Sequence, residues 1–279
     1  MTVQELCRDT TRRLRATGVS NAEQEATWLV RHVLQLSLTS ALVRGDREVG
    51  ADASEAVAQM VGRRLAGEPL QYVLGSTEFF GLELAVGPGV LIPRPETERL
   101  VELALGVYPG TGNVCDLCTG CGAIALSLAS RLPPETLVYG VDISEVALGF
   151  ALRNRDRLGA ANVRFVHGDL FAPFPAETRF TLITANPPYV SSEEYAVLPS
   201  DVRDYEPGQA LLAGADGLDV IRRVAVDARS WLLRDGWLLC EIGSSQGAVA
   251  RAVFHDAGYR GVELVRDYAD RDRVVRARM

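Results

Sequence analysis

The segment Asn113–Ala125 reads NVCDLCTGCGAIA, and its pattern decides how the second half of the chain is expected to fold. An apolar run over Asn113–Leu117 predicts a buried strand, and the apolar residues after the turn predict the start of a helix. Gly120 and Gly122 allow a tight turn and a close approach of the backbone to a ligand. A strand, a glycine-rich turn and a helix in this order are typical of a nucleoside-binding site in a parallel sheet.

Strand and helix patterns alternate from Asn113 to Met279. Strands are predicted at Asn113–Leu117, Leu137–Val141, Val163–Val166, Thr181–Thr184 and Trp237–Ile242, with a closing pair near Val262–Val265 and Arg273–Ala277. Strands that alternate with helices form mostly parallel sheets covered on both faces. The sequence therefore predicts an α/β fold with a doubly wound sheet.

The first part of the chain shows helical periodicity instead. Helices are expected over residues 2–17 and 22–36, and from about Ser54 to Leu65. Gly18 is expected to end the first helix, and Ser20 and Asn21 to cap the second. These patterns predict a small N-terminal helical bundle.

Over Thr77–Val86 the apolar residues recur at every second position instead of with helical spacing. This pattern predicts a β-hairpin between the bundle and the sheet. Leu91-Ile92-Pro93-Arg94-Pro95-Glu96 follows, and its prolines hold the backbone extended before a helix that begins near Thr97. Arg94 and Glu96 either form a surface ion pair or line a cleft. The expected division is a helical bundle at 1–75, a hairpin linker at 76–90 and a sheet domain at 91–279.

Composition narrows the possible partners. The chain has 279 residues, 47% of them hydrophobic, and a net charge of −7, so it can bury a substantial core. The acidic balance argues against stable binding of nucleic acid, which needs a basic face. No apolar run approaches about 18 residues, and the start of the sequence lacks a signal-peptide pattern. We expect a cytoplasmic protein that acts on a protein or a small molecule and not at a membrane.

The five cysteines are an odd number and are expected to be free thiols in a reducing compartment. Cys115, Cys118 and Cys121 form a Cys-x-x-Cys-x-x-Cys run, which raises the alternative of a metal or iron–sulfur site. Cys115 falls within a predicted strand and Cys118 in the turn after it, so the three sulfurs are not expected to converge. No metal is therefore predicted.

An acidic residue is spaced for a nucleoside cofactor. Asp142 lies twenty residues after Gly122 at the end of a predicted strand, where a carboxylate can bind two ribose hydroxyls. The run Gly120-x-Gly122-x-x-Ala125 also fits a dinucleotide site, so the turn alone leaves a nicotinamide cofactor and S-adenosylmethionine open. Asp116 favours the second, since its charge would attract a sulfonium and repel a pyrophosphate.

Two residues at the end of the next strand are candidates for the adenine end of this cofactor. Asp169 and Leu170 follow the predicted strand Val163–Val166 and could bracket the base. An equally good interpretation makes Asp169 a cap on the next turn.

The tetrapeptide Asn186-Pro187-Pro188-Tyr189 follows the apolar run Phe180–Thr184, at the edge where open α/β sheets bind ligands. Its prolines stiffen the loop and have no N–H groups. The Asn186 amide oxygen and the Pro187 carbonyl can then act as two fixed acceptors for an NH₂ group, with Tyr189 stacked on the planar group that carries it. This pattern predicts a site that alkylates an amide or amino nitrogen.

These motifs together resemble the HemK/PrmC family of protein-(glutamine-N5) methyltransferases. The resemblance extends over nearly the whole chain and rests on Asp116–Gly122, Asp142, Asn186–Tyr189 and Leu91–Glu98, with Gly67–Tyr72, Tyr205–Pro207, Asp216–Leu218 and Glu241–Gly243. It implies a class I methyltransferase domain with an N-terminal helical domain that binds the substrate protein. The implied reaction is transfer of a methyl group from S-adenosyl-L-methionine to the glutamine of the Gly-Gly-Gln motif in class I peptide chain release factors.

The resemblance also assigns roles to residues. The expected cofactor contacts are Asp116, Cys118, Thr119, Gly120, Cys121, Gly122, Asp142, Asp169, Leu170 and Asn186. The expected catalytic and substrate-binding residues are Asn186, Pro187, Pro188 and Tyr189, with Arg94 and Glu96 as further substrate contacts. Cys118 replaces the first glycine of the usual Asp-x-Gly-x-Gly-x-Gly turn, so a negative φ is expected there. Leu170 replaces an aromatic residue of some relatives, which predicts weaker stacking on adenine.

Other functions fit parts of the pattern. A paralogue could methylate another NH₂ acceptor, such as adenine N6 of nucleic acid or a different protein or small-molecule amide. A nicotinamide oxidoreductase is disfavoured by Asp116, and a non-catalytic cofactor-binding adaptor by the intact Asn186–Tyr189 loop.

Overall fold

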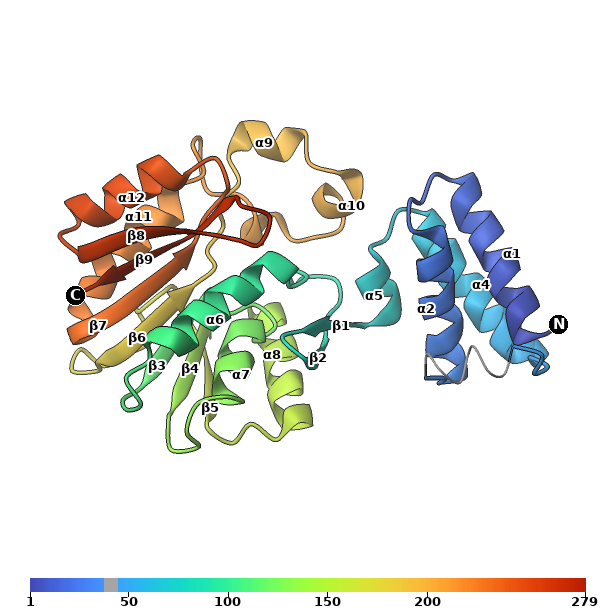
Figure 1. Ribbon diagram of the computed structural model, residues 1–279, viewed down its shortest axis with the longest axis horizontal. Coiled ribbons are helices and arrows are strands. Elements are labelled where there is room, and N and C mark those ends of the chain that lie inside the picture. Colours follow the sequence, from blue (N-terminus) through green and yellow to red (C-terminus); the bar gives the residue numbers. More distant parts are fainter. Residues whose placement is uncertain (38–44) are drawn as a thin grey trace. The chain divides into compact units, whose positions relative to one another are not determined.

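A computed structural model describes residues 1–37 and 45–279 of the chain (Figure 1). These residues form two compact units. The first is Met1–Ser76 with Ser200–Tyr205, and the second is Thr77–Pro199 with Glu206–Met279. The range 1–75 that the sequence assigns to a helical bundle includes residues 38–44, which lie outside the described residues.

The first unit is helical. Its helices are α1 (Val3–Ala16), α2 (Ala22–Leu34), α4 (Ala51–Leu65), α5 (Leu70–Leu74) and α10 (Ser200–Arg203). Leu14, Leu29 and Val61 are fully buried in a common apolar core, as the helical spacing of the sequence requires. Gly18 follows the first helix with a φ of +84°, as predicted.

Two details of the helix ends differ from the expectation. Asn21 precedes α2 but makes no side-chain capping bond, so the predicted cap is wrong. Helix α1 instead has a capping box between Thr2 and Glu5. Helix α4 begins at Ala51, earlier than Ser54, because Gly50 supplies an extended backbone before it.

The segment Ser200–Tyr205 belongs to the first unit although it lies far along the chain. The Tyr205 hydroxyl donates a hydrogen bond to the Ala66 carbonyl at 2.8 Å, and its ring lies against Gly67. The expected boundaries, which place all of 91–279 in one domain, are corrected on this point. Sequence patterns read along the chain do not reveal a pairing of segments 139 residues apart.

The predicted hairpin is formed by β1 (Ser76–Phe79) and β2 (Leu82–Ala85). Phe80 and Gly81 between them have φ values of +51° and +74°, the left-handed pair that a two-residue hairpin turn requires. Asn154 fixes the end of the hairpin, since its side chain bonds both the amide and the carbonyl of Ala85.

The second unit is built on a seven-stranded sheet in the order β5-β4-β3-β6-β7-β9-β8. Its strands are β3 (Val114–Leu117), β4 (Val138–Asp142), β5 (Val163–His167), β6 (Phe180–Ala185), β7 (Leu232–Glu241), β8 (Arg260–Arg266) and β9 (Asp272–Arg278). The first five strands in that order pair in parallel, and β9 pairs antiparallel with both β7 and β8. Every predicted strand is confirmed, and β7 is longer than expected at its start.

Helices surround this sheet. They are α6 (Glu98–Val107), α7 (Ala123–Ala129), α8 (Glu145–Leu158), α9 (Ser192–Ala196), α11 (Asp219–Asp227) and α12 (Gly247–Asp256), with short 3₁₀ turns η1 (Pro95–Thr97), η2 (Gly208–Ala210) and η3 (Ala228–Ser230). The described residues include no helix long and apolar enough to cross a membrane.

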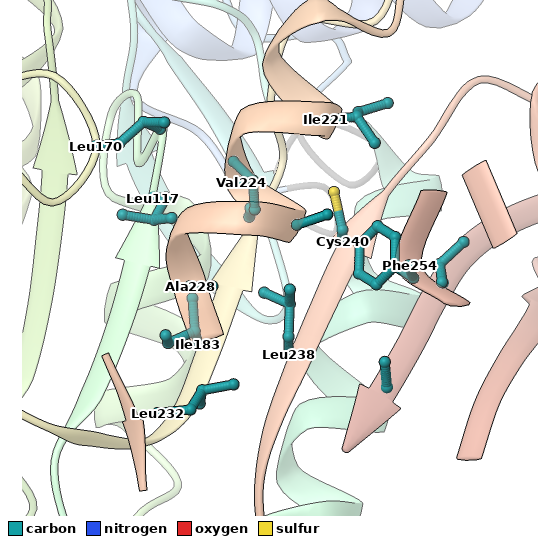
Figure 2. Close-up of a cluster of buried hydrophobic side chains, with 14 of the residues drawn as sticks. Leu117, Leu170, Ile183, Ile221, Val224, Ala228, Leu232, Leu238, Cys240 and Phe254 are labelled. Atoms are coloured by element: carbon teal, nitrogen blue, oxygen red, sulfur yellow. The ribbon is translucent and has the colours of Figure 1, made fainter. Parts of the chain in front are cut away.

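The core that supports the functional edge lies between the sheet and α11 and α12 (Figure 2). Leu117, Ile183 and Leu238 come from three neighbouring strands and pack against Val224 of α11 and Phe254 of α12. All five are fully buried. Successive strand residues face opposite sides of a sheet, so this packing also determines which side chains of β3 point toward α7.

Candidate active site

A cavity of about 340 Å³ lies at the carboxyl ends of β3, β4, β5 and β6, within the second unit. Its wall is formed by the turn after β3, by Val141–Ser144, by Gly168–Leu170 and by parts of the segments 89–97 and 207–212. Asn186, Pro188, Val220 and Arg223 complete it. This is the edge at which open parallel sheets bind ligands, and most of the predicted site residues are found here.

The glycine-rich turn folds with an unusual backbone. Cys118, Gly120 and Gly122 have φ values of +56°, +57° and +84°. The negative φ predicted for Cys118 is therefore wrong, and an L-residue in this conformation costs about 1–2 kcal/mol. The conformation persists because the Thr119 amide bonds Val141 O and the Thr119 hydroxyl bonds Asp116. Burial raises the pKa of the Cys118 thiol, which therefore stays neutral.

Asp116 lies beneath the turn and not in the cavity wall. Its carboxylate is fully buried and accepts hydroxyl hydrogen bonds from Thr119 at 2.6 Å and from Thr184 at 2.8 Å. Burial raises its pKa to about 7, and the two hydroxyls oppose that rise. The cofactor contact predicted for Asp116 stays a prediction; in the structure this carboxylate shapes the turn and links it to β6.

Asp142 lies in the cavity wall, as predicted. One carboxylate oxygen accepts the Gly120 amide at 2.8 Å and the other the Ser144 amide at 2.9 Å. Burial raises its pKa, and these backbone hydrogen bonds oppose the rise. Each oxygen keeps a second lone pair, so the side chain is held in place and can still accept two hydroxyl groups of a ligand.

Asp169 and Leu170 also line the cavity. Asp169 forms an ion pair with Arg223 of α11 at 2.8 Å. Leu170 is buried, with a φ of +50°, and packs against the core that includes Val224 (Figure 2). No sequence pattern indicates a role for Arg223, which lies 54 residues beyond Asp169.

The loop Asn186–Tyr189 is only partly exposed to the cavity. Asn186 and Pro188 line it, whereas Pro187 is buried and Tyr189 is not in the wall. The Tyr189 hydroxyl donates to Glu241 at 3.3 Å, and its carbonyl accepts from Gln246 at 2.9 Å. The stacking of Tyr189 on a bound group stays a prediction; in the structure its hydroxyl and its carbonyl anchor the loop to Glu241 and Gln246.

The side-chain amide of Asn186 is oriented by a contact with Thr97. Its Nδ2 donates to the Thr97 hydroxyl at 3.3 Å, so Oδ1 is the acceptor that this side chain can offer on the cavity wall. Thr97 is buried and also lines the cavity. The predicted acceptor role of Asn186 is compatible with this orientation.

Glu241 at the end of β7 was not assigned a role from the sequence. Its side chain is buried, with 1% of the residue exposed, and burial raises its pKa to about 7. Thr97, Arg273 and Tyr189 oppose that rise, although Oε2 has no partner within hydrogen-bonding geometry. The sequence signal that could have indicated a role for Glu241 is its charge near the end of a predicted buried strand.

Arg94 and Glu96 do not line the cavity within the described residues. Arg94 forms an ion pair with Glu206, whose side chain is almost fully buried and also accepts the Ile92 amide at 3.0 Å. Glu96 is exposed. The predicted ion pair between Arg94 and Glu96 is therefore wrong, because Arg94 binds a partner 112 residues away. The role of the two residues as substrate contacts stays a prediction.

The cysteine run does not form a recognisable metal centre. Cys115 and Cys121 are buried and Cys118 is half-buried, all as free thiols. Over residues 1–37 and 45–279, no group of three or more His, Cys, Asp or Glu side chains is placed to hold a metal ion.

Comparison with known proteins identifies the family. Residues 5–75 match the PrmC N-terminal domain and residues 110–224 a methyltransferase domain. The release factor glutamine methyltransferase of Vibrio cholerae is 40% identical over 98% of this chain and 96% of its own length. The chain belongs to the release factor glutamine methyltransferase family. The family resemblance predicted from the motifs is thereby confirmed.

A further release factor glutamine methyltransferase, from Bordetella pertussis, is 42% identical over 90% of this chain and 92% of its own length. Among solved structures, a Pyrococcus furiosus methyltransferase has a TM-score of 0.54 at 18% identity, covering 71% of this chain and 89% of its own. A T. thermophilus 16S rRNA methyltransferase bound to AdoMet and guanosine has the same TM-score at 20% identity, covering 73% and 49%. These structures support the α/β methyltransferase fold.

Proposed function

We propose that this chain transfers a methyl group from S-adenosyl-L-methionine to the side-chain amide nitrogen of the glutamine in the Gly-Gly-Gln motif of class I peptide chain release factors. The observation that carries this proposal is the place of Asn186. Its side chain lies on the cavity wall after β6, and Thr97 holds its Nδ2 so that Oδ1 is the acceptor. The family of the chain supports the choice of acceptor protein.

The residues of the cavity fit the proposed cofactor. Asp142 would accept the ribose hydroxyls, and the turn at Gly120 leaves room for the amino-acid part, since only Val90 lies within 4.0 Å of an added Cβ. Leu170 and the pair Asp169–Arg223 would lie at the adenine end. When bound, S-adenosyl-L-methionine supplies an electrophilic methyl group on a sulfonium. The residues of the chain bind the cofactor and orient it and the substrate glutamine.

Positioning is the main contribution we assign to the protein. A glutamine amide nitrogen is a poor nucleophile because its lone pair is delocalised. The Asn186 Oδ1 would accept a hydrogen from that nitrogen, with the Pro187 carbonyl as a second acceptor, and align it with the methyl group. Such bonds strengthen as positive charge grows on the nitrogen in the transition state. The stiffness of the Pro187-Pro188 backbone keeps both acceptors in place.

The first unit is proposed to bind the release factor. Its support is the match of residues 5–75 to the PrmC N-terminal domain. A release factor is a protein substrate, so recognition beyond the reacting glutamine is expected to use a surface separate from the cavity. The cytoplasm, where translation takes place, is the proposed location.

Mass spectrometry of a purified release factor incubated with the protein and S-adenosyl-L-methionine tests the proposal. The expected product carries one additional methyl group on the peptide with the Gly-Gly-Gln glutamine. DNA, RNA and a release factor in which this glutamine is replaced serve as comparison substrates. Methylation of nucleic acid at a rate equal to or above that of the release factor would overturn the assignment of the acceptor.

A further inference from the structure

The side chain of Gln246 joins three segments of the second unit. Its Nε2 donates to the Tyr189 carbonyl at 2.9 Å, to the Gly217 carbonyl at 3.2 Å and to the Asp216 carbonyl at 3.3 Å. Its Oε1 accepts the Gly243 amide at 2.9 Å. Gln246 lies 57 residues beyond Tyr189 and directly before α12. One amide group therefore connects the loop after β6, the turn before α11 and the turn after β7.

These partners allow one orientation of the Gln246 amide. An NH₂ group only donates hydrogen bonds, and an amide oxygen only accepts them. Nε2 faces three carbonyl oxygens and Oε1 faces a backbone N–H, so a reversed amide would place oxygen against oxygen and N–H against N–H. The residue is only 8% exposed. A buried amide whose polar atoms are all satisfied makes a well-defined contact.

The backbone of Gln246 is fixed by the turn after β7. Its amide donates to the Gly243 carbonyl at 2.9 Å, and its carbonyl accepts from the Ala250 amide of α12 at 2.9 Å. Together with the bond from the Gly243 amide to Oε1, both the main chain and the side chain of Gln246 close this turn. The side chain therefore starts from a fixed backbone when it binds the distant Tyr189 carbonyl.

The loop Asn186–Tyr189 depends on contacts at its two ends. Its prolines have no N–H groups, so they cannot donate hydrogen bonds to the rest of the fold. At its start the loop continues from β6, whose pairing with β3 and β7 extends to Ala185. At its end, Gln246 binds the Tyr189 carbonyl. Because the two prolines keep the backbone between these ends stiff, a shift of the Tyr189 carbonyl would also move the acceptors of the loop.

The three segments meet closely at Gly217. A Cβ added to this residue would lie 2.3 Å from the Tyr189 carbonyl oxygen and 2.6 Å from Gln246 Nε2. The φ of +73° also favours glycine here. The turn at Gly217 leads into α11, whose Val220 and Arg223 line the cavity. The contact at Gln246 therefore relates the loop to a second part of the cavity wall.

We propose that Gln246 is a positioning residue for methyl transfer: by binding the Tyr189 carbonyl, it holds the Asn186 and Pro187 acceptors at the substrate nitrogen. This inference rests on the proposed function. Gln246 is not part of the cavity wall that the described residues form, so its effect on the reaction passes through the loop. A misplacement of about 1 Å, caused by a substitution outside the reacting groups, can cost about 10²-fold in rate.

Gln246→Met is the direct test, because methionine keeps the approximate length of the side chain and removes both polar ends. The loop should shift and not detach, since Val190 still pairs with Leu212. With full-length protein, release factor and S-adenosyl-L-methionine, kcat should fall by about 10-fold to 100-fold. KM for the release factor and the calorimetric Kd for the cofactor should change by less than about threefold. Ser245→Ala, at the exposed neighbouring position, is the control and should keep the wild-type kcat.

A double-mutant cycle with Asn186→Ala distinguishes positioning from a general loss of stability. If Gln246 acts through the acceptors of the loop, its loss should matter less once one acceptor is absent. The fold-change in kcat caused by Gln246→Met should then shrink by about threefold or more in the Asn186→Ala background. Independent fold-changes that multiply would overturn the inference. A Gln246→Met variant with kcat within about twofold of wild type would also overturn it.

Gln246→Glu keeps the test valid if Gln246→Met does not fold. A protonated carboxyl group has nearly the shape of the amide, and it can accept from Gly243 while it donates to the Tyr189 carbonyl. The ionised group cannot donate. Burial raises the pKa of such a carboxyl above its ordinary value. The ratio of the variant's kcat to the wild-type kcat should therefore rise by about tenfold as the pH falls from about 8 to about 5.5.

Other ionisable side chains lie on the elements packed around Gln246. They are Asp216 with Arg222 before α11, Glu241 with the Tyr189 hydroxyl at the end of β7, and Asp272 of β9 beside Gly247. Both proteins contain these groups, so the ratio of the two kcat values removes their own titration. A ratio that does not change with pH overturns the inference, whereas an inactive wild type rejects the proposed function instead.

Discussion

The Asp142 carboxylate accepts a hydrogen bond from the Gly120 amide at 2.8 Å, across 22 residues of sequence. This bond joins the end of β4 to the turn after β3, and the Ser144 amide holds the second oxygen of the same carboxylate. The carboxylate proposed to bind the ribose therefore also fixes the backbone of the turn that is proposed to contact the rest of the cofactor. Loss of the Asp142 side chain should affect both the ribose contact and the turn.

Asp142→Ala is expected to weaken S-adenosyl-L-methionine binding. Hydrogen bonds to a charged group contribute about 1.5–3 kcal/mol each, so the loss of at least one should lower affinity by about tenfold or more. Isothermal titration calorimetry measures this directly, with Asp156→Ala on the exposed end of α8 as the control. Unchanged affinity in Asp142→Ala would remove this residue from the cofactor site.

Asn186→Ala should lower turnover far more than binding. The proposed hydrogen bond from the substrate NH₂ to Asn186 Oδ1 is stronger in the transition state than in the ground state, so its loss appears in kcat. By analogy with oxyanion-hole donors, kcat should fall about 10²-fold to 10³-fold. Pro187→Ala should have a smaller effect, because the carbonyl remains and only stiffness is lost. Near-normal kcat with weakened cofactor binding in Asn186→Ala would make this residue a cofactor ligand alone.

Gly122→Ala should mainly lower the stability of the protein, whereas Gly120→Ala should mainly weaken cofactor binding. A Cβ at Gly122 would lie 2.6 Å from the Phe165 ring, and the φ of +84° adds strain. Overpacking costs about 1–3 kcal/mol, so Gly122→Ala should lower the free energy of unfolding clearly in urea titrations. Gly120 meets only Val90 at 4.0 Å, so Gly120→Ala should cost only backbone strain of about 1–2 kcal/mol while weakening cofactor binding. Equal stability losses would contradict the packing difference.

The stability of Glu241→Gln relative to wild type should depend on pH. Burial raises the pKa of Glu241 from 4.5 to about 7, so its contribution to stability is fully present below pH 4.5 and is lost as pH rises through 7. At about 1.4 kcal/mol per pKa unit, the loss amounts to about 3 kcal/mol. The free energy of unfolding of Glu241→Gln should therefore increase relative to wild type between pH 5 and pH 8. Parallel curves for the two proteins would show that the buried acid is not perturbed.

Chelators and anaerobic reconstitution with iron should leave methyl transfer unchanged. The three thiols of the Cys115–Cys121 run are buried or half-buried, and burial raises the pKa of Cys121 to about 12, so it stays a neutral thiol and a poor metal ligand. Elemental analysis of the purified protein checks this. Stoichiometric metal, lost together with activity, would revive the metal-site interpretation.

The parts of the molecule that local patterns encode were predictable. Phe80-Gly81 between two alternating runs indicates a hairpin, and the apolar run before Asn186 indicates a strand that ends at the ligand edge. The position of Asp142 in the cavity followed from its spacing to Gly122. In each case the decisive contacts are made within one element or between strands whose order the fold class implies.

The parts that depend on contacts between distant segments were not predictable in the same way. The sequence leaves Arg94 either in an ion pair with its neighbour Glu96 or in a cleft wall, whereas in the structure Arg94 forms an ion pair with Glu206. The sequence places Asp116 at a ligand, and it does not show that Thr119 and Thr184 satisfy both its oxygens beneath the turn. The partner of a buried charged group depends on which side chains lie near it in the folded chain. Periodicity along one segment does not contain that information.

The return of the chain to its helical unit at Ser200–Tyr205 constrains how the protein can be divided. A module attached by one linker can be lost, exchanged or grafted through a single break in the gene. Here the chain crosses between the units near residues 76, 199 and 205, and removal of the first 76 residues would leave Tyr205 without Ala66, the acceptor of its hydroxyl. The two units are therefore expected to be inherited and exchanged together, and chimaeras with a foreign N-terminal domain should carry the matching segment 200–205 from the same donor.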